Sequence, residues 1–178
     1  ESAAWRMAAT TINVVLAVFV FICAGVFLLA SPLSHLIAPG FSTSQIITMS
    51  NLLRIMLMAQ LFFSISGFLT GIILSHQRFL IPALAPVAYN LGIIGGILIL
   101  APRWGIYGPA IGMVVGALLH MLVQLPLAYK LGFRFLPIFN LKHPGVREVI
   151  KLMPPRAIAL GIDQIEQFVA VTLASLLA

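Results

Sequence analysis

Charged residues are scarce in this sequence: only 8% of the 178 residues are Asp, Glu, Lys or Arg, whereas 61% are hydrophobic. A soluble domain carries about 25% charged and about 45–50% apolar residues. The composition therefore excludes a soluble single domain, and it excludes a disordered or fibrous chain as well. An integral membrane protein remains, and the length allows roughly five spans of about 20 residues each.

Cysteine is almost absent, since Cys23 is the only one and no internal disulfide can form. It lies in an apolar run, where an inert packing role is expected. The sequence also lacks a Cys/His cluster with metal spacing, an H-E-x-x-H motif, a phosphate-binding glycine loop and a G-x-S-x-G motif. We therefore expect neither an enzyme, nor a metal, nor a cofactor.

Long apolar runs predict five transmembrane helices, because backbone polar groups must be paired internally in lipid. The expected spans are residues 7–30, 51–74, 79–101, 106–129 and 149–178. Residues 31–50 are predicted to be a polar connection with a turn at Pro39-Gly40. The chain begins without Met and ends inside an apolar run, so an internal segment of a longer transporter-like chain is expected.

The formal net charge of +6 is distributed unevenly between the two sides of these spans. One side holds seven basic residues: Arg6, Arg78, Lys130, Arg134, Lys142, Arg147 and Lys151. The other side holds only Arg103. Because basic residues are retained on the cytoplasmic side, the N-terminus is predicted to be cytoplasmic. The basic residues thus indicate topology rather than a nucleic-acid partner.

The stretch 130–151 mixes aromatic residues with these cations and has two interpretations. It could lie along the cytoplasmic leaflet with its cations toward anionic lipid. It could equally be an ordinary basic loop whose aromatic side chains pack on helix ends.

Glycines recur at intervals of four within the spans, which predicts faces where a second helix approaches closely. These helix-packing candidates are Gly67 and Gly71, Gly92 and Gly96, and Gly108, Gly112 and Gly116. Prolines inside spans remove a helical hydrogen bond and can kink the helix. The hinge candidates are Pro86, Pro126 and Pro155.

Ionisable residues inside a span are costly, so each is a candidate for function. Arg54 lies near the start of the second span, where it either reaches the outer interface or faces a cavity. The fifth span carries a polar side at helical spacing, formed by Arg156, Asp163, Glu166 and Gln167. Such a side suits a hydrated pathway or an ion, and the alternative is a structural pair between helices. Weaker candidates are Asn90, Gln60, His120 and Gln124, which are more typical of polar residues that join helices.

Several short strings resemble the MurJ/MviN family of bacterial lipid II flippases, in the multidrug/oligosaccharidyl-lipid/polysaccharide exporter superfamily. In order along the chain they are LIAPGF (36–41), LRIM (53–56), ALAPVAYN (83–90), GIYG (105–108), QLP (124–126), GVREV (145–149), QI (164–165) and LAS (173–175). Their joint order and spacing make the resemblance specific over nearly the whole chain.

The resemblance implies the third to seventh helices of a fourteen-helix transporter in the bacterial inner membrane. Residues 1–129 would then be four helices of the N-terminal lobe, 130–148 the basic inter-lobe loop, and 149–178 the first helix of the C-terminal lobe. The implied function is translocation of the undecaprenyl-diphosphate-linked peptidoglycan precursor by alternating access. The family's essential cavity arginines lie mainly in helices outside this segment. An acidic residue that many members carry before the LAS string corresponds here to Ala170.

The implied partners are lipid II or a related polyprenyl-diphosphate glycolipid and membrane lipids, with a coupling ion or the membrane potential as driving force. Two alternatives stay open at this point. One is an exporter of another polyprenyl-linked glycan or of drugs in the same superfamily. The other is a non-transporting membrane scaffold for cell-wall enzymes.

Overall fold

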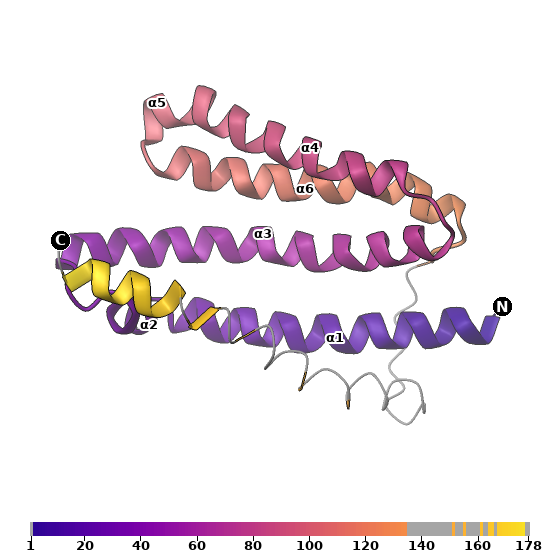
Figure 1. The fold of residues 1–178 in the computed structure, drawn as a ribbon, viewed down its shortest axis with the longest axis horizontal. Coiled ribbons are helices and arrows are strands. Elements are labelled where there is room, and N and C mark those ends of the chain that lie inside the picture. Colours follow the sequence, from indigo (N-terminus) through magenta and orange to yellow (C-terminus); the bar gives the residue numbers. More distant parts are fainter. Residues whose placement is uncertain are drawn as a thin grey trace. The chain divides into compact units, whose positions relative to one another are not determined.

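The computed structural model describes residues 2–134, 151, 155, 161, 164–165 and 167–176, with the backbone alone for residues 2–8. Every regular element among these residues is helical (Figure 1). The elements are α1 (Ser2–Leu28), α2 (Ala30–Ile37), α3 (Thr43–Ser75), α4 (Leu80–Gly95), the π-helical segment η1 (Gly96–Leu100), α5 (Ala101–Trp104), α6 (Tyr107–Lys130) and a further apolar helix, Gln167–Leu176. The predicted all-α class is confirmed.

Four of the predicted spans appear as helices long and apolar enough to cross a bilayer. They comprise Ala9–Leu28, Thr43–Ser75, Leu80–Trp104 and Tyr107–Lys130. Half of the fifth predicted span, 149–178, lies outside the described residues, and its described part includes the helix Gln167–Leu176.

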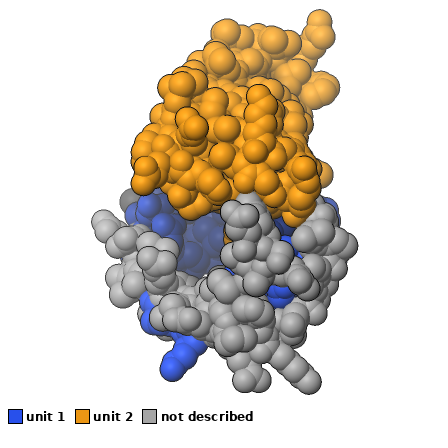
Figure 2. All heavy atoms as spheres, turned by 90° about the vertical axis from the view of Figure 1, so that its right-hand side faces the viewer, with its two compact units in different colours: residues 1–51, 136–178 blue, residues 52–135 orange. Residues whose placement is uncertain are grey.

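The chain divides into two compact units, coloured separately in Figure 2. Unit 1 comprises residues 1–51 and 136–178, and unit 2 comprises residues 52–135. The helix α3 contributes its first residues to unit 1 and the rest to unit 2. The predicted lobes 1–129 and 149–178, with the loop 130–148 between them, remain a prediction.

The connection predicted at 31–50 is wrong in extent, because most of it is helical. Only residues 38–42 separate α2 from α3, with the expected turn at Pro39-Gly40. The start of α3 is set by a capping box, in which the Ser42 amide donates to Gln45 Oε1 at 2.7 Å and the Gln45 amide to Ser42 Oγ at 3.4 Å. We overlooked this Ser-x-x-Gln signal, which adds about two turns before Asn51.

The stop predicted at Pro102–Gly105 also begins too early, because α5 is helical as far as Trp104. Just before it, the helix widens into η1, and the Ala101 amide bonds to Gly96 O five residues back. Pro102 explains this widening, since its ring lacks an N–H and clashes with the carbonyl four residues earlier in a regular helix. The turn to α6 then uses Gly105, whose φ of +55° favours glycine.

The helices α3 and α6 end in the same hydrogen-bond motif. After α6, Phe133 N donates to Ala128 O and Gly132 N to Tyr129 O, with Gly132 at φ +98°. After α3, Arg78 N donates to Ile73 O, and Gln77 takes the corresponding left-handed position at φ +56°. Gln77 therefore adopts a left-handed backbone conformation that is less costly in free energy for glycine.

Candidate functional site

Glycine contacts hold α4 and η1 against α6 in unit 2. A Cβ added to Gly96 would lie 2.6 Å from Gly112 Cα and 2.7 Å from Gly108 O. A Cβ added to Gly112 would lie 2.8 Å from both Gly92 O and Gly96 Cα. Gly116 likewise leaves room for the ring of Tyr89, whose Cδ2 would lie 2.9 Å from an added Cβ. The backbones thus approach more closely than any larger residue would permit.

The other predicted glycine pair has different surroundings. Gly67 and Gly71 are exposed, and an added Cβ at either would meet no described atom within 4 Å. The same four-residue spacing therefore accompanies a close contact at Gly92 and Gly96 and an open face at Gly67 and Gly71. A packing role for this second pair stays a prediction.

A cluster of four polar side chains joins α3 to α6, and we call it the polar cluster: Ser66, Thr70, His120 and Gln124. Gln124 is at its centre and is fully buried, as is Ser66. Its Nε2 donates to Ser66 Oγ at 2.7 Å, and its Oε1 accepts from Thr70 Oγ1 at 2.7 Å. Ser66 Oγ also lies 2.7 Å from His120 Nδ1. The members repeat at i and i+4 on both helices, so two matching faces meet.

The distances in this cluster are consistent with one assignment of hydrogen-bond donors and acceptors. Ser66 Oγ accepts the Gln124 amide, so its own hydrogen is available for His120 Nδ1. A second donor, Gln124 Nε2, lies 3.3 Å from the same Nδ1. These bonds favour the neutral tautomer of His120 with its proton on Nε2.

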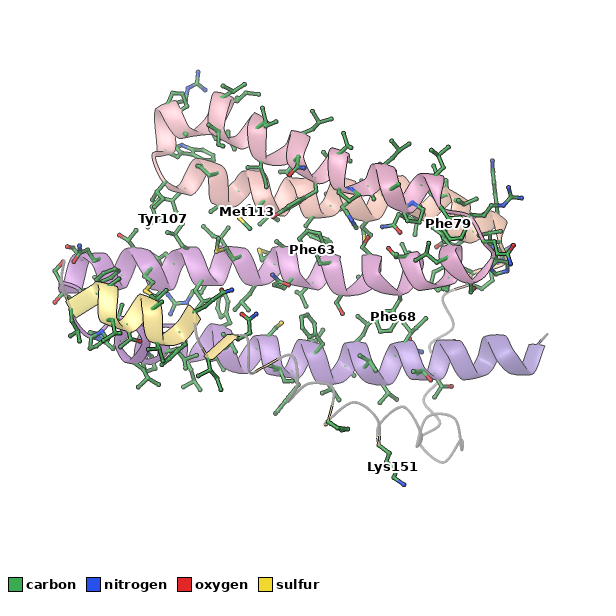
Figure 3. All side chains as sticks on the ribbon, in the orientation of Figure 1. Phe63, Phe68, Phe79, Tyr107, Met113 and Lys151 are labelled. Carbon is green, nitrogen blue, oxygen red and sulfur yellow. The ribbon has the colours of Figure 1, made fainter. Side chains whose placement is uncertain are left out.

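Aromatic rings extend the cluster toward α4. Phe63 lies on the side of α3 that faces α4 and α6 (Figure 3), with its ring centroid 5.0 Å from that of Tyr89 and 5.3 Å from that of His120. Both pairs meet edge to face, which is a favourable geometry for aromatic rings. Glycine contacts, edge-to-face ring contacts and hydrogen bonds thus connect three helices in one unit.

Sequence reasoning identified half of the polar cluster. His120 and Gln124 were weaker candidates for residues that join helices, and they do join α6 to α3. Ser66 and Thr70 were missed, although their spacing matches that of His120 and Gln124. Asn90 and Gln60, the other weaker candidates, are exposed in the described structure.

The structure describes two of the five substrate-pathway or ion candidates, Arg54 and Gln167. Arg54 is half-buried on α3 and has an interaction partner. Gln167 is exposed at the start of the helix Gln167–Leu176. Arg156, Asp163 and Glu166 lie outside the described residues.

The proline candidates are exposed, and two of them lie inside continuous helices. Pro86 is within α4 and Pro126 is within α6. Pro155 is among the described residues of the fifth span, where it is helical and exposed. A hinge role for the three prolines stays a prediction.

Among the spanning helices of unit 2, the formal charges are Arg54, Arg103 and Lys130, and Arg103 lies one residue before the end of its span at Trp104. Lys130 is the last residue of α6, so the helix interiors that meet at the polar cluster are neutral. Such an interior holds helices together in lipid, because its polar groups satisfy one another. It does not by itself match a diphosphate, which is bound through cations.

The fold and the buried polar contacts define a multi-pass α-helical membrane protein. Over residues 1–178 the chain matches the family model described as "Lipid II flippase MurJ". The chain therefore belongs to the lipid II flippase MurJ family, which is a bacterial membrane transporter family. This finding confirms the resemblance inferred from the ordered strings.

Individual relatives agree with this assignment. The lipid II flippase MurJ of Burkholderia cenocepacia is 32% identical over 128 residues, which cover 68% of this chain and 25% of that protein. The probable lipid II flippase MurJ of Buchnera aphidicola subsp. Acyrthosiphon pisum is 32% identical over 144 residues, covering 79% and 28% of the two chains. The corresponding protein of Thermotoga maritima is 34% identical over 103 residues, covering 58% and 19%. The chain thus spans about a quarter of the length of the first two of these relatives.

Proposed function

We propose that the intact protein moves lipid II, the undecaprenyl-diphosphate-linked peptidoglycan precursor, from the inner to the outer leaflet of the bacterial cytoplasmic membrane. The observation that carries this proposal is the match of all 178 residues to the lipid II flippase MurJ family. The names of the relatives support lipid II over another glycan lipid or a drug. A scaffold without transport gains no support from either observation.

The proposed reaction changes no covalent bond, so the protein acts as a transporter and not as an enzyme. Its difficulty is physical, because a diphosphate head group must pass through a medium in which charge is strongly disfavoured. A polar path through the helices lowers this barrier, and alternating access keeps the path closed on one side at a time. The driving force is a coupling ion or the membrane potential.

Within this path, we assign a role to the polar side of the fifth span. Asp163 and Glu166 have short side chains that cannot easily reach the interface from within a span. We expect them to face the hydrated pathway or an ion, with Arg156 and Gln167 on the same side. On the second span, Arg54 is the candidate for contact with the diphosphate.

Complementation tests both the function and this role. The native lipid II flippase of a bacterium is depleted, and the intact protein is expressed with and without Asp163→Asn plus Glu166→Gln. The charge-preserving pair Asp163→Glu plus Glu166→Asp is the matched control. We expect growth with the parent and the control but not with the neutral variant.

Each other outcome has a definite meaning. Growth with the neutral variant would make the two carboxylates structural. No growth with a well-expressed, membrane-inserted parent would contradict lipid II as the substrate and turn attention to another glycan lipid or to a scaffold.

The orientation is a separate part of the proposal, with the N-terminus in the cytoplasm. Single cysteines at Ser44, in the first turn of α3, and at His76, directly after its last residue, probe the two ends of this helix in an otherwise cysteine-free protein. A membrane-impermeant maleimide applied to whole cells should label the cysteine at position 44 and not the one at position 76. The reverse pattern would overturn the predicted topology.

A further inference from the structure

The turn between α2 and α3 meets the last helix of unit 1 at one point. A Cβ added to Gly40 would overlap the backbone carbonyl of Ser175 and would lie 2.9 Å from Leu176 Cα. The contact joins residues more than a hundred positions apart in the chain. It is made by backbone on backbone, so it tolerates no side chain at position 40.

Gly40 is needed for this contact and not for the turn itself. The glycines with positive φ in the described structure are Gly105 and Gly132, and Gly40 is not among them. Alanine could therefore adopt the backbone conformation of the turn. The substitution Gly40→Ala thus removes the approach of Ser175 while leaving the conformation of the turn accessible.

One hydrogen bond accompanies the contact. Thr172 Oγ1 lies 2.9 Å from Ile37 O, a carbonyl at the C-terminal end of α2, and equally 2.9 Å from Phe168 O in its own helix. If the helix moves away, the hydroxyl keeps the Phe168 bond, so no buried donor is left unpaired. The contact can therefore separate at low cost.

The rest of this helix is not buried by the described residues. From Gln167 to Leu176, every residue except Thr172 and Ser175 is exposed. On the turn side, Ala38 and Ser34 are fully buried, and the Ser34 hydroxyl bonds to Ala30 O within α2. Among the described residues, the contacts of this helix with the turn lie in its C-terminal half and involve no charged group.

We propose that this contact, made by Gly40 with Ser175 and Thr172 with Ile37, is a latch that closes and opens during the transport cycle. Gly40 sets the distance at which the latch can close, and Thr172 adds a bond that is exchanged without leaving an unpaired donor. The proposal rests on the proposed transport function. Its own subject is a conformational equilibrium, which is measured without any substrate.

Spin labels on Leu36→Cys and Leu173→Cys report the latch in the intact, otherwise cysteine-free protein. Both side chains are exposed, at 66% and 57%, so the labels leave the contact itself untouched. Pulsed distance measurements in lipid nanodiscs should show two populations, a short distance for the closed latch and a longer one for the open latch. A single short distance, with and without lipid II, would overturn the proposal.

Two variants and a control test the proposed cause. Gly40→Ala should abolish the short distance, and Thr172→Val should lower the ratio of closed to open latch about twofold to tenfold. The control is Gly25→Ala on α1, where an added Cβ meets nothing within 4 Å and both populations should persist. Retention of the short distance in Gly40→Ala would contradict the proposal.

Lipid II translocation is then measured on the same variants. We expect Gly40→Ala to lose at least tenfold in rate and Gly25→Ala to match the parent. If Gly40→Ala opens the latch but translocates at the parental rate, the latch is not part of the cycle. If the parent moves no lipid II but shows both distances, the proposed substrate fails while the latch equilibrium stands.

Discussion

Replacing Gln124 by Leu tests whether hydrogen bonds, and not packing alone, join α3 to α6. The change removes two bonds between helices, one to Ser66 and one from Thr70, both at 2.7 Å. In membrane proteins such bonds contribute about 0.6 kcal/mol on average and up to about 1.7 kcal/mol. Leucine fills a similar volume, and the Thr70 hydroxyl can turn to a carbonyl of its own helix. We therefore expect a loss of about 1–3 kcal/mol in the free energy of unfolding.

A double-mutant cycle with Thr70→Val isolates one of these bonds. Reversible unfolding of the intact protein in mixed micelles should give a coupling of about 0.5–1.5 kcal/mol between the two positions. Thr48→Val is the control, because the Thr48 hydroxyl donates to Ser44 O within α3. Its effect should stay below about 0.5 kcal/mol. Strictly additive effects of Gln124→Leu and Thr70→Val would refute the reasoning, since the bond would then contribute nothing.

Three further predictions concern helix contacts and helix ends, and unfolding measurements on the intact protein check each of them. Gly96→Ala should lower the free energy of unfolding by about 1–3 kcal/mol, because its Cβ would meet the backbone of α6. Gly71→Ala should leave that free energy unchanged or raise it by up to about 1 kcal/mol. Equal effects of the two substitutions would contradict the geometry. Gln77→Gly should stabilise by about 1 kcal/mol, because it relieves a left-handed glutamine, and a loss of stability would show that its side chain matters more. Ser42→Ala should cost about 0.5–2 kcal/mol and speed amide exchange in the first turn of α3, and unchanged exchange would exclude the capping role.

The all-α class and the four described spanning helices could be predicted because both depend on composition along the chain. An uncharged run of about 20 residues needs no partner to become a helix in lipid. Helix ends were harder to predict, and the errors have local causes. The Ser42–Gln45 capping box and the proline at position 102 are local signals that we overlooked, because we expected the polarity of 31–50 and 102–105 to end the helices.

Glycine spacing shows where prediction from the sequence stops. A four-residue interval places two glycines on one face of a helix, and this follows from helical geometry alone. Whether another backbone occupies that face depends on the neighbouring helix. Gly92 and Gly96 meet α6, while Gly67 and Gly71 face open space within the described structure.

The sequence by itself determined that this chain spans a membrane, that its spans are helices and, through the order of its short strings, that it belongs to the MurJ family. These properties depend on the residues of each segment and on the order of the segments along the chain, and not on contacts between segments. Only the tertiary structure decided that Ser66 and Thr70 pair with His120 and Gln124, and that Gly40 admits Ser175. The physical reason is range: hydropathy acts on every segment alone, whereas a hydrogen bond or a close backbone contact exists only when two distant segments meet.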